Sequence, residues 1–215
     1  MIRFLFVGEG TSDDGLVPHL EALLVEAGAD AAEGETVDYG RLRIAKPGRR
    51  TVSAKLGIGL RLAAPVDMVF VHRDADSRDP EPRRREVANA VAAICAVPRH
   101  VPVVPVQELE AWLLVDEEAI RLVAGRPSGR RALGLPSRTE RVEELSRPKE
   151  LLNRAILEAS ETTGRRREKL ERRLPHLRRL LLERLDRNGP VRRLSAWKRL
   201  VADTRSAVAA HLRHP

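Results

Sequence analysis

Short apolar runs and amphipathic helical patterns alternate along the first part of the chain. Apolar runs typical of buried strands occupy residues 2–7, 66–71 and 101–106, and a weaker alternation indicates another strand over 37–44. Apolar residues at helical spacing predict helices over 16–27, 52–63, 81–96 and 107–125. This alternation predicts an α/β fold with an open, mostly parallel sheet of about four strands and helices on both faces.

The pattern changes after residue 125. Residues 126–138 are rich in Gly, Pro and Ser and predict a loop. Beyond it the periodicity is helical throughout, and we expect helices over 139–160, 165–187 and 194–213. The predicted organisation is an α/β domain over 1–125, the loop over 126–138, and a basic helical segment over 139–215 that packs on the α/β domain.

The composition is that of a folded protein without a membrane segment. Apolar residues make up 42% of the 215 positions, and no apolar run approaches the ~20 residues that a membrane span needs. The single cysteine, Cys95, excludes an internal disulfide and favours a reducing compartment. We therefore expect a cytoplasmic location.

The positive charge is concentrated in the last third of the chain. The formal net charge is +8, and residues 141–215 hold 20 Lys and Arg against 10 Asp and Glu. Clustered cations attract nucleic acid through long-range electrostatics and counterion release. The candidate nucleic-acid contacts are Arg165, Arg166, Arg167, Arg172 and Arg173. Only five of the 39 basic residues are lysine, so a genome of high GC content explains the arginines equally well.

Carboxylates follow three of the expected strands: Glu9 the first, Asp74 and Asp76 the third, and Glu108 and Glu110 the fourth. Loops at the carboxyl ends of parallel strands share one edge of the sheet. Residues two apart in an extended chain point the same way, so Asp74 and Asp76 are expected to share a target, and so are Glu108 and Glu110 if the chain there is still extended. Facing carboxylates need a counter-charge, which a hard divalent cation supplies. Taken singly, each acid also suits a surface turn, a helix cap or a helix start.

Three segments of the sequence resemble a known domain. "VGEGTSDDGLV" and "MVFVHRDADSRD" resemble a TOPRIM domain, the module of topoisomerases, primases and OLD-family nucleases. Together with "VPVQELEAWLL", they resemble most closely the short bacterial TOPRIM-like proteins. The resemblance covers residues 1–125, and it extends to the helical segment only loosely through "RPKELL" and "LSAWKRL".

The resemblance implies roles for individual residues. Glu9, Asp74 and Asp76 correspond to the metal-binding acids of the family, and Glu108 and Glu110 match acids in the fourth-strand region that similar proteins use for the same cluster. The implied cofactor is Mg²⁺ or Mn²⁺. This chain departs from the commonest first-strand motif because Thr11 and Ser12 precede the next acids, which leaves the participation of Asp13 open.

A TOPRIM site implies metal-dependent chemistry on phosphodiesters. Topoisomerases need a tyrosine nucleophile, and the only tyrosine, Tyr39, lies in an early strand region without signs of that role. Primases need further modules, so we expect a nuclease acting on DNA or RNA, in nucleic-acid processing or phage defence. Lys149 is a candidate transition-state cation or else a surface lysine. His72 is a candidate proton carrier or else a strand-end histidine bonded to the backbone.

Two other functions compete with this hypothesis. A dinucleotide-binding loop begins with Gly8-x-Gly10, but Asp13 occupies the position of the third glycine, and a P-loop lacks its Gly-Lys-Ser/Thr. The stronger rival is a non-catalytic TOPRIM-like subunit that binds a metal or a partner, such as an ATPase, a defence-system component or a second copy of the chain. In that case Trp112 and Trp197 are either interface anchors or core residues.

Overall fold

The computed structural model describes residues 1–40, 51–94 and 99–213, and the chain divides into two compact units. The sheet unit comprises residues 1–73, 80–104 and 198–215, and the helical unit comprises 74–79 and 105–197. This division differs from the predicted boundary at residue 125. The chain leaves the sheet unit directly after the fourth strand and returns to it with the last helix.

The sheet has four strands, all parallel, in the order β2-β1-β3-β4. They are β1 (Ile2–Val7), β2 (Ala32–Thr36), β3 (Met68–His72) and β4 (Arg99–Val103). The two central strands are apolar, and every residue of β3 is buried. The predicted α/β class with an open parallel sheet is confirmed.

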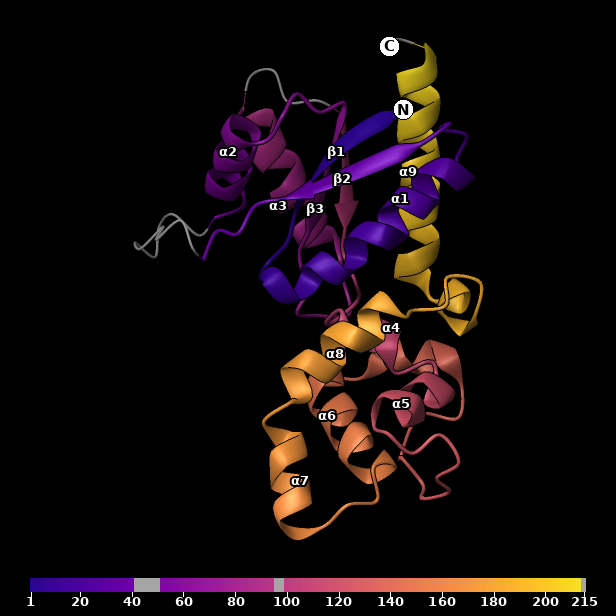
Figure 1. The fold of residues 1–215 in the computed structure, drawn as a ribbon. Helices are drawn as coiled ribbons and strands as arrows, with labels where there is room; N and C mark the ends of the chain where they lie inside the picture. The colour runs from indigo at the N-terminus through magenta and orange to yellow at the C-terminus, as the bar shows by residue number, and fades with distance from the viewer. Residues whose placement is uncertain (41–50, 95–98, 214–215) are drawn as a thin grey trace. The chain divides into compact units, whose positions relative to one another are not determined.

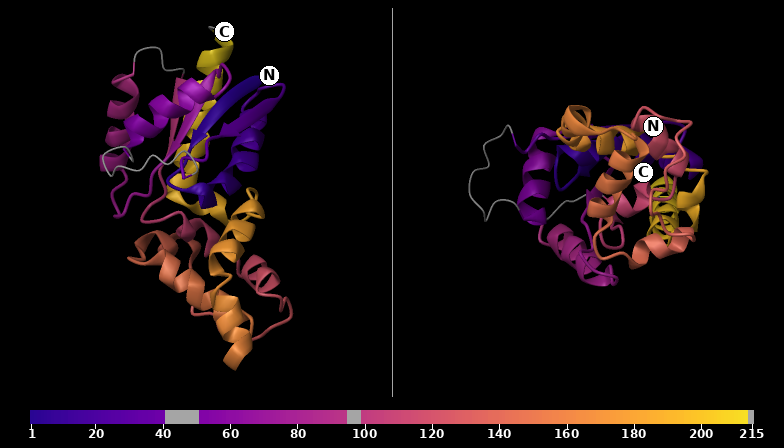
Figure 2. Two further views of the ribbon diagram at one scale, coloured as in Figure 1. Left: turned by 60° about the vertical axis from the view of Figure 1, so that its left-hand side comes forward. Right: turned by 90° about the horizontal axis from the view of Figure 1, so that it is seen from below.

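Helices cover both faces of this sheet, as expected. The sheet unit contains η1 (Thr11–Leu16), α1 (Val17–Glu26), α2 (Val52–Leu62), α3 (Glu81–Ala92) and most of α9 (Ser195–Arg213). Figures 1 and 2 show α2 and α3 on one face and α1 and α9 on the other. Leu5 and Val69 face the first pair of helices and form a buried cluster with Leu56 of α2. Phe4 and Phe70 alternate to the opposite face, where their rings meet edge to face at 5.0 Å.

The helical unit has its own core. Its elements are α4 (Glu110–Leu113), α5 (Glu117–Val123), η3 (Thr139–Glu144), α6 (Pro148–Ala159), α7 (Gly164–Glu171), α8 (Leu174–Glu183), η4 (Pro190–Arg193) and the first residues of α9. The rings of Trp112 and Trp197 meet edge to face at 5.1 Å, and both are buried. Burial supports the core role over the interface role for this pair. No helix in the described part of the chain is long and apolar enough to cross a membrane.

Some expected elements are shifted or divided. The strand expected over 37–44 is wrong for residues 37–40, because β2 ends at Thr36; residues 41–44 lie outside the described residues. The helix expected over 107–125 is divided into α4 and α5. The cause is Asp116, whose side chain accepts the N–H of Ala119 and caps a new helix.

Candidate functional site

The turn after β1 fixes the backbone on which Glu9 stands. One oxygen of Asp13, Oδ2, accepts the N–H groups of Glu9 at 2.8 Å and Gly10 at 3.1 Å. The Nζ of Lys55, on α2, donates to the carbonyls of Gly8 at 2.9 Å and Glu9 at 2.7 Å. The acidic Asp13 therefore binds the N–H donors of this turn, and the basic Lys55 binds its carbonyl acceptors.

Glycine at position 8 follows from the close approach of Asp13. A Cβ at Gly8 would lie 3.1 Å from the Cβ of Asp13 and 3.2 Å from its Oδ2. That spacing is tighter than ordinary van der Waals contact. The glycine therefore lets the acid reach the backbone of the turn, and no phosphate cradle is needed to explain it.

His72 is bound to this same acid. Its Nδ1 lies 3.0 Å from Oδ2 of Asp13, and both residues are buried. A carboxylate is thus a partner of His72. Burial alone would raise the pKa of Asp13, but the hydrogen bond and charge of His72, with the amide of Gly10, outweigh it and lower the pKa to about 2. Asp13 therefore acts as an organising residue within the turn.

The side chain of Glu9 faces a cation of the chain itself. Its Oε1 lies 2.9 Å from a terminal nitrogen of Arg73, the residue that follows β3. The Nε of Arg73 lies 3.5 Å from Glu86 of α3. Arg73 thus sits between two carboxylates of the sheet unit.

A second acidic cluster lies within the helical unit. The Oδ1 of Asp74 accepts the N–H of Leu109 at 2.8 Å, which ties the loop after β3 to the segment that carries Glu108 and Glu110. Burial raises the pKa of Glu108, and the charges of Glu110 and Asp74 add to the rise, although the amide of Lys149 opposes it. The three carboxylates therefore interact electrostatically.

Lys149 and Arg178 neutralise part of this cluster. The backbone N–H of Lys149 donates to Glu108 at 2.9 Å, and its Nζ lies 3.1 Å from Glu110. The Nε of Arg178, on α8, lies 3.4 Å from the same Glu110 oxygen. Burial alone would lower the pKa of Lys149, but the charge of Glu110 raises it. Lys149 is therefore an integral part of the cluster and not an isolated surface lysine.

Two residues with left-handed backbone conformation, Asp76 and Gln107, join the acidic loops through backbone hydrogen bonds. Asp76 has φ 53° and Gln107 has φ 62°. The N–H of Asp76 donates to the carbonyl of Gln107 at 2.9 Å, and the N–H of Gln107 donates to Ser77 at 3.0 Å. Such backbone is costly for non-glycine residues and persists when the surroundings hold it. The extended geometry expected for Asp74-x-Asp76 is therefore wrong, and Asp76 is exposed on a tight turn.

The predicted acids have the oxygen donors that a hard cation prefers, but within the described residues they are not grouped as a metal site. Carboxylate oxygens are the donors that Mg²⁺ and Mn²⁺ prefer. Glu9, however, belongs to the sheet unit, and the other four acids belong to the helical unit. Among residues 1–40, 51–94 and 99–213, no three His, Cys, Asp or Glu side chains are grouped to hold a metal ion. A metal at Glu9 or Glu110 would have to displace the basic partners of these side chains.

Four of the five predicted nucleic-acid contacts are exposed arginines, and the fifth, Arg167, forms ion pairs within the protein. No residue of α7 is buried. The guanidinium groups of Arg165, Arg166, Arg172 and Arg173 are exposed and make no ion pair or hydrogen bond within the described residues. Arg167 instead lies 3.2 Å from Glu158 and 3.6 Å from Glu171. The positive charge that this region can offer to a nucleic acid therefore does not include Arg167.

Several site residues escaped the sequence analysis. Lys55 and Arg178 are single cations inside helices, and nothing in their local pattern separates them from solvated residues. Arg73 has a sequence signal, because it directly precedes Asp74 in the motif at the end of a strand. A cation beside acids in such a motif suggests a counter-charge.

One comparison with known proteins gives a match. The family model described as "Domain of unknown function (DUF4276)" matches residues 14–198. No curated protein and no solved structure matches this chain. The matched segment includes the acidic cluster of the helical unit and begins after Glu9.

Proposed function

The chain belongs to the DUF4276 family, and because that description assigns no activity, we propose from the residues that it is a metal-dependent nuclease. The reaction is the hydrolysis of phosphodiester bonds in DNA or RNA. The observation that carries the proposal is the hydrogen bond from Leu109 to Asp74, since it joins two acidic loops into one cluster. Glu108 and Glu110 flank Leu109, and Asp76 lies in the locked turn beside it.

Basic residues beside the acids support a phosphodiester substrate. Lys149 and Arg178 lie within 3.4 Å of Glu110, at the position where a phosphate oxygen would need cationic contacts. The exposed arginines of α7 belong to the same unit and suit the backbone of a longer nucleic acid. Mg²⁺ or Mn²⁺ is the expected cofactor because carboxylate oxygens are the donors that these ions prefer. This donor chemistry supports a class of reaction, metal-dependent hydrolysis, but does not define the individual steps.

A cleavage assay with a matched pair of variants tests this function. Labelled single- and double-stranded DNA and RNA are incubated with Mg²⁺, with Mn²⁺ and with EDTA. We expect cleavage with metal only, reduced by about 100-fold or more in Asp74→Asn. Asp30→Asn, the same change at an exposed residue, should keep full activity. Cleavage that survives EDTA, or that Asp74→Asn retains, contradicts the proposal.

A specific observation favours a non-catalytic role as the second candidate. Glu9 is paired with Arg73, and Glu110 with both Lys149 and Arg178, so the chain supplies counter-charges that a metal would otherwise provide. A subunit of this kind would bind a cytoplasmic partner such as an ATPase or a defence-system component. Absence of cleavage on every substrate, with thermal unfolding unchanged by Mg²⁺ and Mn²⁺, supports this candidate over the nuclease.

A further inference from the structure

Helix α7 is exposed along its whole length. None of its eight residues, Gly164–Glu171, is buried. Figures 1 and 2 show it at one end of the helical unit, joined to α8 and beside α6. Arg167 connects it to Glu158 of α6 at 3.2 Å. The side of α7 opposite Arg167 is therefore accessible to a partner.

The cations of α7 are gathered on this accessible side. Successive residues of an α-helix are rotated by about 100°, so basic side chains that are exposed share a sector of about 120°. We call this sector the basic face, and its members are Arg165, Arg166, Lys169, Arg172 and Arg173. Arg167 and Glu171, which lie 3.6 Å from each other, occupy the opposite side, and Glu168 lies at the border. The positive charge is thus segregated to one side of the helix.

The basic face continues past the last residue of α7. Arg172 and Arg173 keep a right-handed helical backbone, with φ −64° and −97°. Their N–H groups donate to the carbonyls of Glu168 at 3.3 Å and Leu170 at 2.8 Å. The helical spacing of side chains therefore extends to both arginines, and the basic face spans about 12 Å along the helix axis.

The cations of the basic face form two rows. Arg165, Lys169 and Arg172 follow one another at spacings of four and three residues and form the first row. Arg166 and Arg173, seven residues apart, form the second row, about 80° further round the helix. The charged groups of both rows make no ion pair or hydrogen bond within the described residues. They are therefore available to two lines of negative charge.

The helical unit offers no aromatic ring on which unpaired bases could stack. Proteins that bind single strands combine cations with exposed aromatic side chains. Among the described residues of this unit, the Phe, Tyr and Trp side chains are those of Trp112 and Trp197, which are buried against each other at 5.1 Å. The basic face therefore suits the backbone of a nucleic acid and not its unpaired bases.

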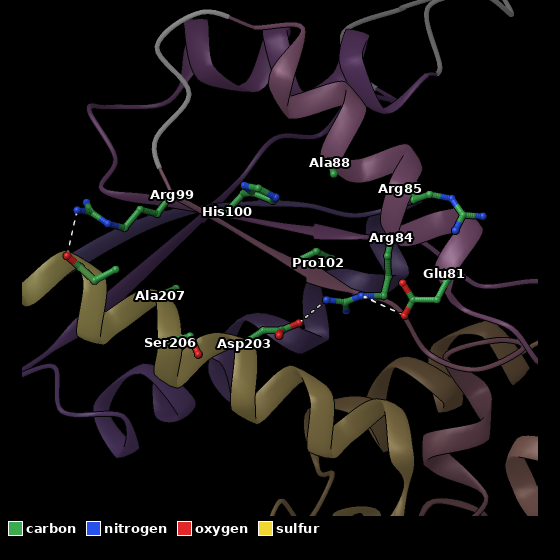
Figure 3. A pocket seen from close by; sticks show the side chains of 11 residues that line it. Glu81, Arg84, Arg85, Ala88, Arg99, His100, Pro102, Asp203, Ser206 and Ala207 are labelled. Carbon is green, nitrogen blue, oxygen red and sulfur yellow. Dashed lines mark hydrogen bonds and ion pairs between the residues drawn. The ribbon is translucent and has the colours of Figure 1, made fainter.

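Arginines in the sheet unit give a contrast. In the groove between α3 and α9, Arg84 lies 2.6 Å from Asp203 (Figure 3). Arg99 donates to the carbonyl of Ala210 at 3.1 Å in the same groove. These two guanidinium groups hold α9 to the rest of their unit, whereas those of the basic face contact no other part of the described chain.

We propose that the basic face of α7 binds the major groove of double-stranded DNA. An α-helix with its side chains is about 10–12 Å across, and the major groove of B-form DNA is about 12 Å wide. The two rows of cations then meet the phosphates of the two strands that border the groove. Duplex RNA fits poorly, because its major groove is deep and narrow. This inference rests on the proposed function for a nucleic-acid substrate and names the class of that substrate, duplex DNA.

Fluorescence anisotropy in the presence of EDTA tests the basic face without requiring cleavage. The probes are a labelled duplex DNA, a duplex RNA of the same sequence and one of the DNA strands alone. We expect the duplex DNA to bind the protein about tenfold more tightly than either of the other probes, with an affinity that falls steeply with salt.

A separate variant removes each row of the basic face. The triple change Arg165→Gln, Lys169→Gln and Arg172→Gln should weaken binding of duplex DNA and reduce the slope of log affinity against log salt by roughly 2.7. The double change Arg166→Gln and Arg173→Gln should reduce the same slope by roughly 1.8. Since these side chains are exposed, both variants should unfold at the temperature of the unchanged protein.

The charge-matched control for the second row is the double change Arg192→Gln and Arg193→Gln. These arginines of η4 are exposed in the same unit, and the variant should bind duplex DNA like the unchanged protein. Equal weakening in the control and in the second-row variant overturns the proposal, as does binding of single-stranded DNA or duplex RNA that is as tight as that of duplex DNA.

The outcomes also separate this inference from the proposed nuclease. Preferential binding of duplex DNA in EDTA, with no cleavage of any substrate in Mg²⁺ or Mn²⁺, supports the basic face and contradicts the nuclease. Metal-dependent cleavage without any preference for duplex DNA supports the nuclease and contradicts the role given to the basic face.

Discussion

The ring of His72 and the carboxylate of Asp13 lie 3.0 Å apart in the buried part of the sheet unit. The same carboxylate oxygen holds the amides of Glu9 and Gly10. The pair therefore links the last residue of β3 to the turn that follows β1. The position of Glu9 therefore depends on both Asp13 and His72.

Replacing Asp13 should destabilise the protein strongly. Asp13→Ala removes the partner of a buried histidine and of two backbone amides, and such losses cost about 3–5 kcal/mol. The free energy of unfolding in urea measures the change. Glu33→Ala, which removes an exposed ion pair with Arg3 at 3.7 Å, should cost less than about 1 kcal/mol. Equal losses in the two variants would contradict the role given to Asp13.

The same acid predicts a loss of stability at low pH. The pKa of Asp13 is lowered to about 2 from 3.8, so its contribution is present above about pH 4 and disappears as the pH falls through 2. The difference corresponds to about 2 kcal/mol. Urea unfolding of the unchanged protein and of Asp13→Asn between pH 2 and pH 5 checks this, because the variant should lose less stability across that interval.

Lys55 should be needed to keep the Glu9 turn closed. Lys55→Met retains much of the aliphatic side chain but removes the donor to the carbonyls of Gly8 and Glu9, at an expected cost of about 1–2 kcal/mol. Hydrogen exchange at the amide of Gly10 should accelerate by about tenfold. Lys169→Met on the exposed helix α7 is the control and should leave this exchange unchanged. Unaltered exchange in Lys55→Met would show that Asp13 alone maintains the turn.

Two glycines should respond oppositely to alanine. A Cβ at Gly34 of β2 would lie 2.5 Å from the ring of Phe4 and 2.6 Å from Val17, so Gly34→Ala should cost about 1–3 kcal/mol. A Cβ at Gly57 within α2 would meet no atom of the described residues closer than 3.8 Å, and Gly57→Ala should stabilise the helix by about 0.5–1 kcal/mol. Thermal unfolding of both variants checks the signs.

The exposed arginines of α7 should carry its nucleic-acid affinity. Neutralising Arg165 and Arg166 together should weaken binding and reduce the slope of log affinity against log salt by roughly 1.4–1.8. Arg167→Ala should mainly lower stability, because that side chain is paired with Glu158. Filter binding across a salt series measures the slope. A double change at Arg192 and Arg193, exposed residues of η4, is the charge-matched control.

The fold was predictable where local pattern and tertiary structure agree. The central strands are continuous apolar runs, and β1 has the predicted bounds, Ile2–Val7. Strand β2 was placed too late because its sequence, Ala32–Thr36, contains two glutamates and a glycine. Gly34 belongs there because Phe4 and Val17 occupy the space of a side chain, and a distant contact of that kind leaves no local signal.

The site was predictable in its residue types but not in its pairings. The positions of Asp74, Glu108 and Glu110 at strand ends indicated that acids would gather, and the helical unit does bring these three into electrostatic contact. The left-handed backbone of Asp76 was not predictable, because it depends on Gln107, 31 positions further along the chain. The pairing of His72 with Asp13 likewise joins residues that are distant in sequence.

The strand at one outer edge of the sheet, β4, contains a residue that cannot donate a backbone hydrogen bond, Pro102. The carbonyl of Val103 accepts the N–H of Arg73, so Val103 directs its backbone groups inward, and Pro102 directs its own outward. A fifth strand beside β4 would seek an N–H at that position and find a proline ring. The sheet therefore resists extension by another chain at this edge, which protects a strongly apolar core from edge-to-edge aggregation.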